Sequence, residues 1–160
     1  MLVAGGMRVT CLLVSILLTM AACDSRCEPN DRGTSTCGLS PPQQHLPVPA
    51  TPTFTLFVSN QSFDLDPVDI EIELDDQLAV SGNFEVGSQH SWFEFEFALA
   101  PGNHEIRVTT ADADTALVRP FEISGRKYGV VNFWYYAAGS PEPTPPQFSF
   151  TVSDDRPVFE

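Results

Sequence analysis

Cysteine side chains offer the most distinctive chemistry in this 160-residue sequence. A thiol can carry an acyl group, form a disulfide or bind a metal ion. The four cysteines, Cys11, Cys23, Cys27 and Cys37, all lie near the N-terminus. No histidine lies at metal-ligand spacing from the last two, so the pattern predicts no metal site. Attachment and cross-linking remain as the chemistry these thiols could perform.

Cys23 follows a segment with the features of an export signal. Arg8 is the only charged residue before it, and an apolar run from Val9 to Met20 comes next. That run is too short to span a membrane, which takes roughly 20 apolar residues. Ala21 and Ala22 then provide the small side chains that suit a peptidase subsite.

The stretch Leu-Leu-Thr-Met-Ala-Ala-Cys, residues 17–23, resembles the signal peptide of bacterial lipoproteins. Met20 stands where that family usually has leucine. The resemblance implies that residues 1–22 are a cleaved signal peptide and that Cys23 carries the lipid. Two or more acyl chains anchor firmly, because each buried methylene contributes about 0.8 kcal/mol. The expected place is the bacterial cell membrane or outer membrane, facing the periplasm or exterior.

Several alternatives to this reading of the N-terminus stay open. The segment could be a plain secretory signal with a chance cysteine, or an uncleaved anchor. Met7 could be the true start, since Met7 and Arg8 would form a more ordinary beginning. In the enteric lipoproteins, an aspartate at the position of Asp24 favours retention in the inner membrane.

Cys27 and Cys37 enclose a short polar loop and form a candidate disulfide. An exported protein meets an oxidising compartment, where such a bond can form. A loop of this size would be stabilised by about 2–3 kcal/mol. A reduced pair without a role is the alternative.

Aromatic residues form the candidate ligand platform. Trp134 and Tyr136 belong to residues 127–136, which are apolar on both faces, and Trp92 lies earlier in the chain. Stacked rings bind sugars and other flat apolar faces, although packing in the core is the favoured interpretation. Residues 127–136 should form a central strand, covered on both sides or lying partly under a loop.

Motifs of catalysis are absent from the sequence. It has no Gly-x-Ser-x-Gly, phosphate loop or dinucleotide fingerprint, and His45, His90 and His104 have no nucleophile nearby in sequence. Glu94 and Glu96, two apart on one strand face, approach the separation of about 5–10 Å that glycosidases use, but both are expected to face open solvent. We therefore predict a protein that is not an enzyme and that has no cofactor.

Clustered aspartates raise the question of calcium. Asp64, Asp66 and Asp69 fall in one loop, and Asp112 and Asp114 fall in another turn. Calcium needs several oxygens converging at about 2.3–2.6 Å, and the first run lacks the glycine and glutamate of an EF-hand loop. The favoured interpretation is that these residues form turns through hydrogen bonds to the backbone.

The elements that position these residues begin after a tether. Residues 23–53 are predicted to be a lipid-anchored tether, because residues 38–53 contain prolines that exclude a helix or a sheet interior. Such a segment favours an extended conformation at about 3.1 Å per residue, with a reach of roughly 50 Å. It would lift the following domain away from the bilayer.

From Phe54 the hydrophobic period becomes two, which is typical of strands. The clearest cases are residues 68–74 and 93–99; further candidates are 54–59, 77–80, 83–86, 104–110, 116–123, 127–136 and 147–152. A turn is expected at Ser81 and Gly82. The pattern predicts one all-β domain over 54–153: an antiparallel sandwich of about seven to nine strands, immunoglobulin- or transthyretin-like. Residues 154–160 should be a frayed tail.

One local stretch supports this fold by resemblance. Leu-Ala-Pro-Gly-Asn-His-Glu-Ile-Arg-Val, residues 99–108, resembles the hairpin of PEGA-type and transthyretin-like extracellular domains. The strand and Asp-rich turn over residues 72–80 fit the same pattern. The resemblance implies an accessory or binding module and brings no catalytic residues.

The charge of the chain limits its partners. It has 8 Lys and Arg against 21 Asp and Glu, a net charge of −13. Such acidity argues against nucleic acid as a partner. The expected partners are the membrane, through lipid on Cys23, and an envelope protein or glycan. The predicted function is a membrane-anchored envelope lipoprotein with a non-catalytic interaction module; the alternative is a carbohydrate-binding or carbohydrate-acting envelope protein with an unrecognised carboxylate site.

Overall fold

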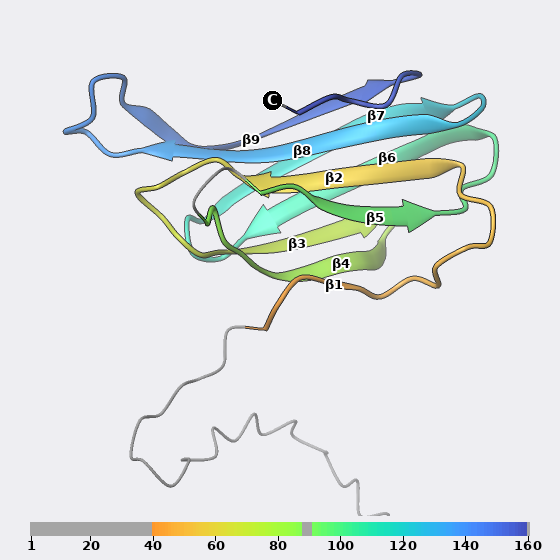
Figure 1. Ribbon diagram of the computed structural model, residues 1–160, viewed down its shortest axis with the longest axis horizontal. Coiled ribbons are helices and arrows are strands. Elements are labelled where there is room, and N and C mark those ends of the chain that lie inside the picture. Colours follow the sequence, from red (N-terminus) through yellow and green to blue (C-terminus); the bar gives the residue numbers. More distant parts are fainter. Residues whose placement is uncertain (1–39, 88–90, 160) are drawn as a thin grey trace, which may run out of the picture. The chain divides into compact units, whose positions relative to one another are not determined.

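Alternating apolar and polar residues produce strands throughout the described part of the protein. A computed structural model describes residues 40–87 and 91–159, which contain nine strands and no helix (Figure 1). The strands are β1 (Gln43–Gln44), β2 (Phe54–Asn60), β3 (Val68–Leu74), β4 (Gln77–Phe84), β5 (Phe93–Phe97), β6 (Gly102–Thr110), β7 (Thr115–Ile123), β8 (Lys127–Tyr136) and β9 (Thr144–Ser153). Cys23, Cys27 and Cys37 lie outside the described residues, so the lipid anchor and the disulfide stay predictions.

The strands form two sheets, which confirms the predicted all-β sandwich. Sheet A has the strand order β1-β4-β3-β6-β7, and sheet B has the order β5-β2-β8-β9. All neighbours are antiparallel except β2 and β8, which run parallel over the whole of β2. The sequence did not reveal this pair, because side chains alternate with a period of two in either direction of pairing.

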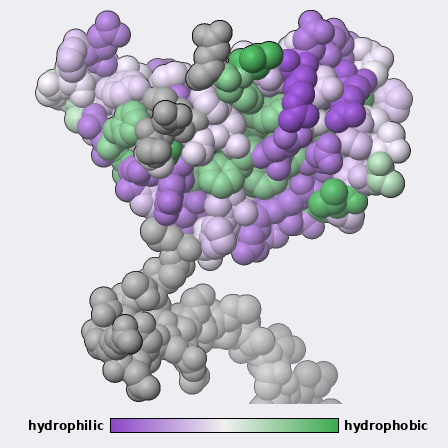
Figure 2. All heavy atoms as spheres, viewed as in Figure 1, coloured by the Kyte–Doolittle hydropathy of each residue, from purple (hydrophilic) through white to green (hydrophobic). Residues whose placement is uncertain are grey.

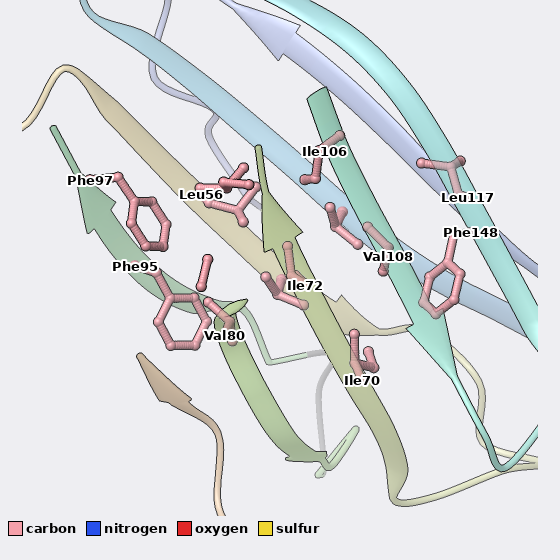
Figure 3. Close-up of a cluster of buried hydrophobic side chains, with 14 of the residues drawn as sticks. Leu56, Ile70, Ile72, Val80, Phe95, Phe97, Ile106, Val108, Leu117 and Phe148 are labelled. Carbon is pink, nitrogen blue, oxygen red and sulfur yellow. The ribbon is translucent and has the colours of Figure 1, made fainter. Parts of the chain in front are cut away.

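The core lies between the sheets and is lined by the residues that the alternation selects. In β3, Val68, Ile70, Ile72 and Leu74 are at most 2 % exposed, while the acidic residues between them are exposed or half-buried. Phe95 and Phe97 of β5 pack into the same cluster from sheet B (Figure 3). Burial of one such side chain stabilises the fold by about 1.5–3 kcal/mol.

Strand β8 is central in sheet B, as predicted, and it packs closely against β2. Val131 and Phe133 point into the core and are fully buried. At Gly129, a Cβ atom would lie only 2.6 Å from Cζ of Phe54. The glycine therefore makes room for a phenylalanine ring of the neighbouring strand.

Strand β4 continues through Ser81 and Gly82, so the turn predicted there is wrong. The carbonyl oxygen of Pro41 would lie 2.6 Å from a Cβ at Gly82, which has φ of +148°. Any side chain at this position would collide with the backbone of Pro41, so glycine allows the two backbones to approach closely.

The segment that approaches Gly82 belongs to the predicted tether. Gln43 and Gln44 pair with β4 as strand β1, and the backbone N–H of His45 donates to the carbonyl of Ala79 over 2.8 Å. The side chain of Leu46 packs on the core. The domain therefore begins near residue 40, and the described part of the tether is docked on it.

Side chains close both open edges of the sandwich. The amide of Gln44 donates to the carbonyl of Glu96 over 2.9 Å and accepts from its N–H over 3.1 Å, so β5 meets β1. On the other side, β7 packs near β9, and the hydroxyl of Thr115 donates to the carbonyl of Pro146. Pro120 lies on β7, at the edge of sheet A, where a missing N–H costs no hydrogen bond within the sheet.

The C-terminal tail is ordered as far as Phe159, contrary to the expected fraying. After β9 the chain turns back (Figure 1), and Phe159 stacks on Trp92 while Arg156 pairs with Glu94. Aromatic and charged side chains thus replace the backbone pairing that ended with β9.

Hydrophilic side chains cover much of the face seen in Figure 2, with hydrophobic ones showing between them in patches. This agrees with the acidic composition of the chain. In the described ranges, no helix is long and apolar enough to cross a membrane.

Candidate functional site

Two of the predicted platform residues, Trp134 and Tyr136, line one open groove of about 580 Å³. We name it the aromatic groove; its other lining residues are Phe63, Asp64, Ser140, Pro141 and Glu142. Phe63 is 57 % exposed, an unusual position for so large an apolar side chain. No sequence pattern singles out Phe63, because it lies in a loop outside the alternating segments.

The groove lies where three parts of the chain meet. Trp134 and Tyr136 come from the end of β8, where its register with β9 is irregular. Phe63 and Asp64 come from the loop between β2 and β3, and residues 140–142 come from the loop between β8 and β9. Loops held by a rigid sandwich are common positions for binding residues.

Hydrogen bonds hold the two aromatic rings of β8 in place. The hydroxyl of Tyr136 donates to the carbonyl of Gln61 over 3.1 Å. The indole Nε1 of Trp134 donates to the hydroxyl of Ser149 over 3.2 Å. Because both polar atoms are committed to the protein, the rings are left to offer their apolar faces, and fixed rings lose little entropy on binding.

The loops of the groove are tied together by buried or bridging polar groups. Asp64 accepts from the N–H of Ala137 over 2.8 Å and from the hydroxyl of Ser140 over 3.1 Å. Asn60 is fully buried, and its side chain donates to the carbonyl of Leu65 and accepts from the N–H of Ser62. Residues 60–62, Asn-Gln-Ser, match a glycosylation sequon, and the side chain of its asparagine makes these hydrogen bonds within the protein.

The groove presents chemistry suited to binding. Ring faces can stack on a flat or apolar ligand, and Glu142 at the rim is exposed and able to accept hydrogen bonds. Asp64 already spends one carboxylate oxygen on holding the loops together. Asp64 therefore serves the shape of the groove, and the carboxylate of Glu142 lies at its rim.

Trp92, the third predicted platform residue, lies apart from this groove. Its ring stacks on Phe159 with ring centroids 4.2 Å apart and planes at 13°. The indole N–H is buried and has no hydrogen-bond partner among the described residues. The platform predicted from the sequence is therefore divided between two places.

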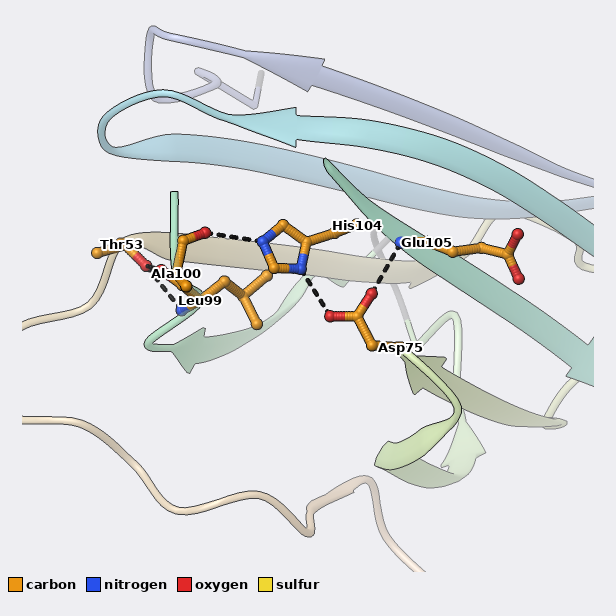
Figure 4. A network of polar contacts seen from close by, with 6 residues as sticks. All are labelled: Thr53, Asp75, Leu99, Ala100, His104 and Glu105. Atoms are coloured by element: carbon orange, nitrogen blue, oxygen red, sulfur yellow. Dashed lines mark hydrogen bonds and ion pairs between the residues drawn. The ribbon is translucent and has the colours of Figure 1, made fainter. Parts of the chain in front are cut away.

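His104 forms a polar network with the turn between β3 and β4 (Figure 4). Its Nδ1 lies 2.6 Å from the carboxylate of Asp75, and its Nε2 lies 2.7 Å from the carbonyl of Ala100. A carboxylate and a carbonyl both accept hydrogen bonds, so this arrangement favours the protonated ring, in which both nitrogens donate. Asp75 also accepts from the N–H of Glu105, over 3.0 Å.

The network shifts the pKa values of both partners. Burial alone would lower the pKa of His104, but the hydrogen bonds and the charge of Asp75 outweigh it and raise the pKa. Burial would raise the pKa of Asp75, but the bonds from His104 and Glu105 lower it. This pair ties the turn between β3 and β4 to the start of β6.

The clustered aspartates bind backbone groups of their own protein. Asp66 accepts from the N–H of Val86. Asp69 accepts from the hydroxyl of Thr110 at the end of β6 and from the N–H groups of Ala111 and Asp112 in the turn that follows. Burial opposes these bonds at Asp69, yet they lower its pKa overall. No group of three metal-binding side chains occurs in the residues that the structure describes.

Glu94 and Glu96 each face a cation. Glu94 lies 2.6 Å from Arg156, and Glu96 lies 3.6 Å from Arg126. His45, which had no predicted role, lies 2.7 Å from the hydroxyl of Ser81. His90 lies outside the described residues.

No family model, no curated protein and no solved structure matches the chain. Any proposal of function therefore depends on the geometry described above.

Proposed function

We propose that the chain is a membrane-anchored lipoprotein of the bacterial envelope whose β-sandwich is a non-catalytic binding module. The aromatic groove is the observation that carries the binding role. It sets Phe63, Trp134 and Tyr136 around a volume of about 580 Å³ at loops fixed by hydrogen bonds. The motif ending at Cys23 supports the anchor.

The binding role is tested by capture of envelope components with the domain as bait. Detergent-solubilised membranes are passed over the wild-type chain and over Trp134→Ala, and bound proteins and glycans are compared. We expect a reproducible partner that the substitution removes. Leu78→Ala is the matched control, because Leu78 is also exposed, at 41 %, but lies on β4 in sheet A.

Thermal unfolding of each variant accompanies the capture, so that loss of fold is distinguished from loss of binding. Tyr136→Phe keeps the ring and removes only the hydroxyl that donates to Gln61. No partner on a folded wild-type domain, or equal capture by Trp134→Ala, contradicts the proposal.

A glycan is the second candidate ligand, and the ring faces favour it. Sugar rings present flat C–H faces that stack on aromatic side chains, while their hydroxyls donate to carboxylates such as Glu142. Binding to a glycan array, followed by loss in Trp134→Ala, tests this candidate. A hydrolytic activity would require a carboxylate pair, and its loss in Glu94→Gln or Glu96→Gln would identify it.

The anchor has a separate test. Cys23→Ser should abolish incorporation of labelled palmitate, leave the signal segment uncleaved and alter membrane association, whereas Cys27→Ser should do none of these. If Cys23→Ser is processed and bound like the wild type, the lipoprotein assignment is wrong while the binding role is untouched.

A further inference from the structure

Residues 154–159 form a strap across the outer face of sheet B. The strap begins at the end of β9, where Lys127 at the start of β8 lies 2.5 Å from Asp154. It then reaches β2 and β5, because Phe159 contacts Phe57 of β2 and Arg156 contacts Glu94 of β5. The strap thus crosses sheet B from one edge strand to the other.

Two side chains of the strap fill complementary positions on the sheet. The ring of Phe159 stacks on Trp92 and meets the ring of Phe57 edge-on, with centroids 5.2 Å apart. Arg156 lies 2.6 Å from the carboxylate of Glu94, and its guanidinium carbon lies 5.2 Å from the centre of the Phe57 ring. We name this surface of Trp92, Phe57 and Glu94 the aromatic slot.

Side chains make most of the contacts that hold the strap. In the described ranges, no hydrogen bond between backbone groups joins residues 154–159 to a strand of the sheet, and the N–H of Asp155 donates to the hydroxyl of Ser153 over 3.0 Å. Val158 is 88 % exposed, and the side chain of Asp154 is 79 % exposed. Segments with so few buried contacts open at low cost.

The closed strap also leaves a polar group unsatisfied. The indole N–H of Trp92 is buried without a partner in the described structure while Phe159 covers its ring. Such a group carries an uncompensated loss of hydration. Both observations favour a strap that exchanges with another occupant.

We propose that the aromatic slot is a docking site for an extended protein segment with an arginine three residues before an aromatic side chain, and that the strap occupies it in competition. The strap itself shows the fit, since its Arg-Pro-Val-Phe sequence provides both anchors. An arginine suits Glu94 and the acidic chain, and an aromatic ring suits Trp92 and Phe57. The aromatic slot shares no residue with the aromatic groove.

The test uses a synthetic peptide of residues 154–160 and a chain that ends at Ser153. Trp134→Phe in both proteins leaves Trp92 as the only tryptophan, so its fluorescence reports the slot. We expect saturable binding to the shortened chain and at least about tenfold weaker binding to the full chain, whose own strap has a high effective concentration.

Peptide variants distinguish the anchors from unspecific contact. Phe159→Ala and Arg156→Ala in the peptide should each weaken binding, the former by about tenfold or more. Val158→Ala is the matched control and should bind unchanged, because that side chain is exposed.

If the shortened chain does not fold, the full chain with Arg156→Ala and Phe159→Ala replaces it, since its strap lacks both anchors. Absence of peptide binding to a folded protein with an open slot overturns the proposal. Equal binding to the closed wild type, or to the Phe159→Ala peptide, overturns it as well. Preference for a glycan at Trp92 over the peptide would assign the slot to another class of ligand and also contradict the proposal.

Discussion

At the scale of single residues, the pair of His104 and Asp75 should make stability depend on pH. The pKa of His104 is raised above its usual 6.5, so its contribution is full below pH 6.5 and is lost as the pH rises through the folded-state value. The pKa of Asp75 is lowered below 3.8, so its contribution is lost as the pH falls through that lower value. The pair therefore contributes most between about pH 3.8 and 6.5.

We expect the free energy of unfolding to fall by up to about 1 kcal/mol above this window, since Asp75 is 47 % exposed and water screens the pair. NMR titration of the His104 ring and urea unfolding at several pH values measure the two effects. Asp75→Asn keeps the turn and removes the charge, so the pKa of His104 should fall. An unchanged titration in that variant would show that Asp75 is not the cause.

Asp69 should be the most costly of the clustered aspartates to replace. Its carboxylate accepts three hydrogen bonds from the turn between β6 and β7, including 2.6 Å from the hydroxyl of Thr110. Asp69→Ala leaves these donors without their partner and should destabilise the domain by about 1–3 kcal/mol.

Chemical unfolding compares Asp69→Ala with Asp155→Ala, whose exposed side chain makes no such bonds in the described structure. Equal stability of the two variants would show that the turn does not depend on its cap. Added calcium should stabilise neither the wild type nor the variants, because the aspartate oxygens are directed to backbone groups.

The sequence did not indicate which distant residues the polar side chains would meet. The clustered aspartates were expected to form turns through nearby backbone, but Asp66 accepts from Val86 and Asp69 from Asp112, 20 and 43 positions away. The partnership of His104 with Asp75 joins residues 29 positions apart, and no local pattern reports it. Phe159 escaped notice for the same reason, because its partner Trp92 belongs to a distant strand.

At the scale of elements, the contact between β8 and β2 limits what position 129 can hold. Gly129→Ala places a Cβ 2.6 Å from Cζ of the fully buried Phe54, which has little room to move. We expect destabilisation of about 1–3 kcal/mol, measured by thermal or urea unfolding. Gly139→Ala, in open space within the loop after β8, should be nearly neutral.

Most strands could be predicted because one face is buried and the other is exposed to solvent, which makes apolar and polar residues alternate. The alternation predicted strands over residues 68–74 and 93–99; β3 matches the first, and β5 matches the second but ends at Phe97. Strand β1 could not be predicted, because it is two residues long and lies among prolines that usually exclude strands. The turn at Ser81 and Gly82 failed because a glycine needed for close backbone approach looks like a turn glycine in sequence.

At the scale of the whole molecule, residues 40–53 should behave as part of the domain. A chain that begins at Phe54 loses β1, the double hydrogen bond of Gln44 to Glu96 and the packing of Leu46. We expect the unfolding free energy to drop by about 2–4 kcal/mol relative to a chain that begins at Ser40. The exposed edges of β4 and β5 should also promote association.

Unfolding curves and light scattering of the two chains check this expectation. Gln44→Ala in the longer chain isolates the bridge between the sheets and should account for a part of the loss. Identical stability of both chains would mean that residues 40–53 are a spacer, as the proline content alone suggests.

The parallel pairing of β2 with β8 should slow the folding of the domain. Phe54 pairs with Lys127, so the first long strand must wait for a partner that is synthesised much later. Contacts so distant in sequence are slow to form, and we expect refolding in milliseconds to seconds, measurable by stopped-flow fluorescence. Until β8 arrives, the apolar face of β2 has no complete sheet to join. We therefore expect the nascent chain to expose this face, and to be prone to association, for longer than a chain of local hairpins would be.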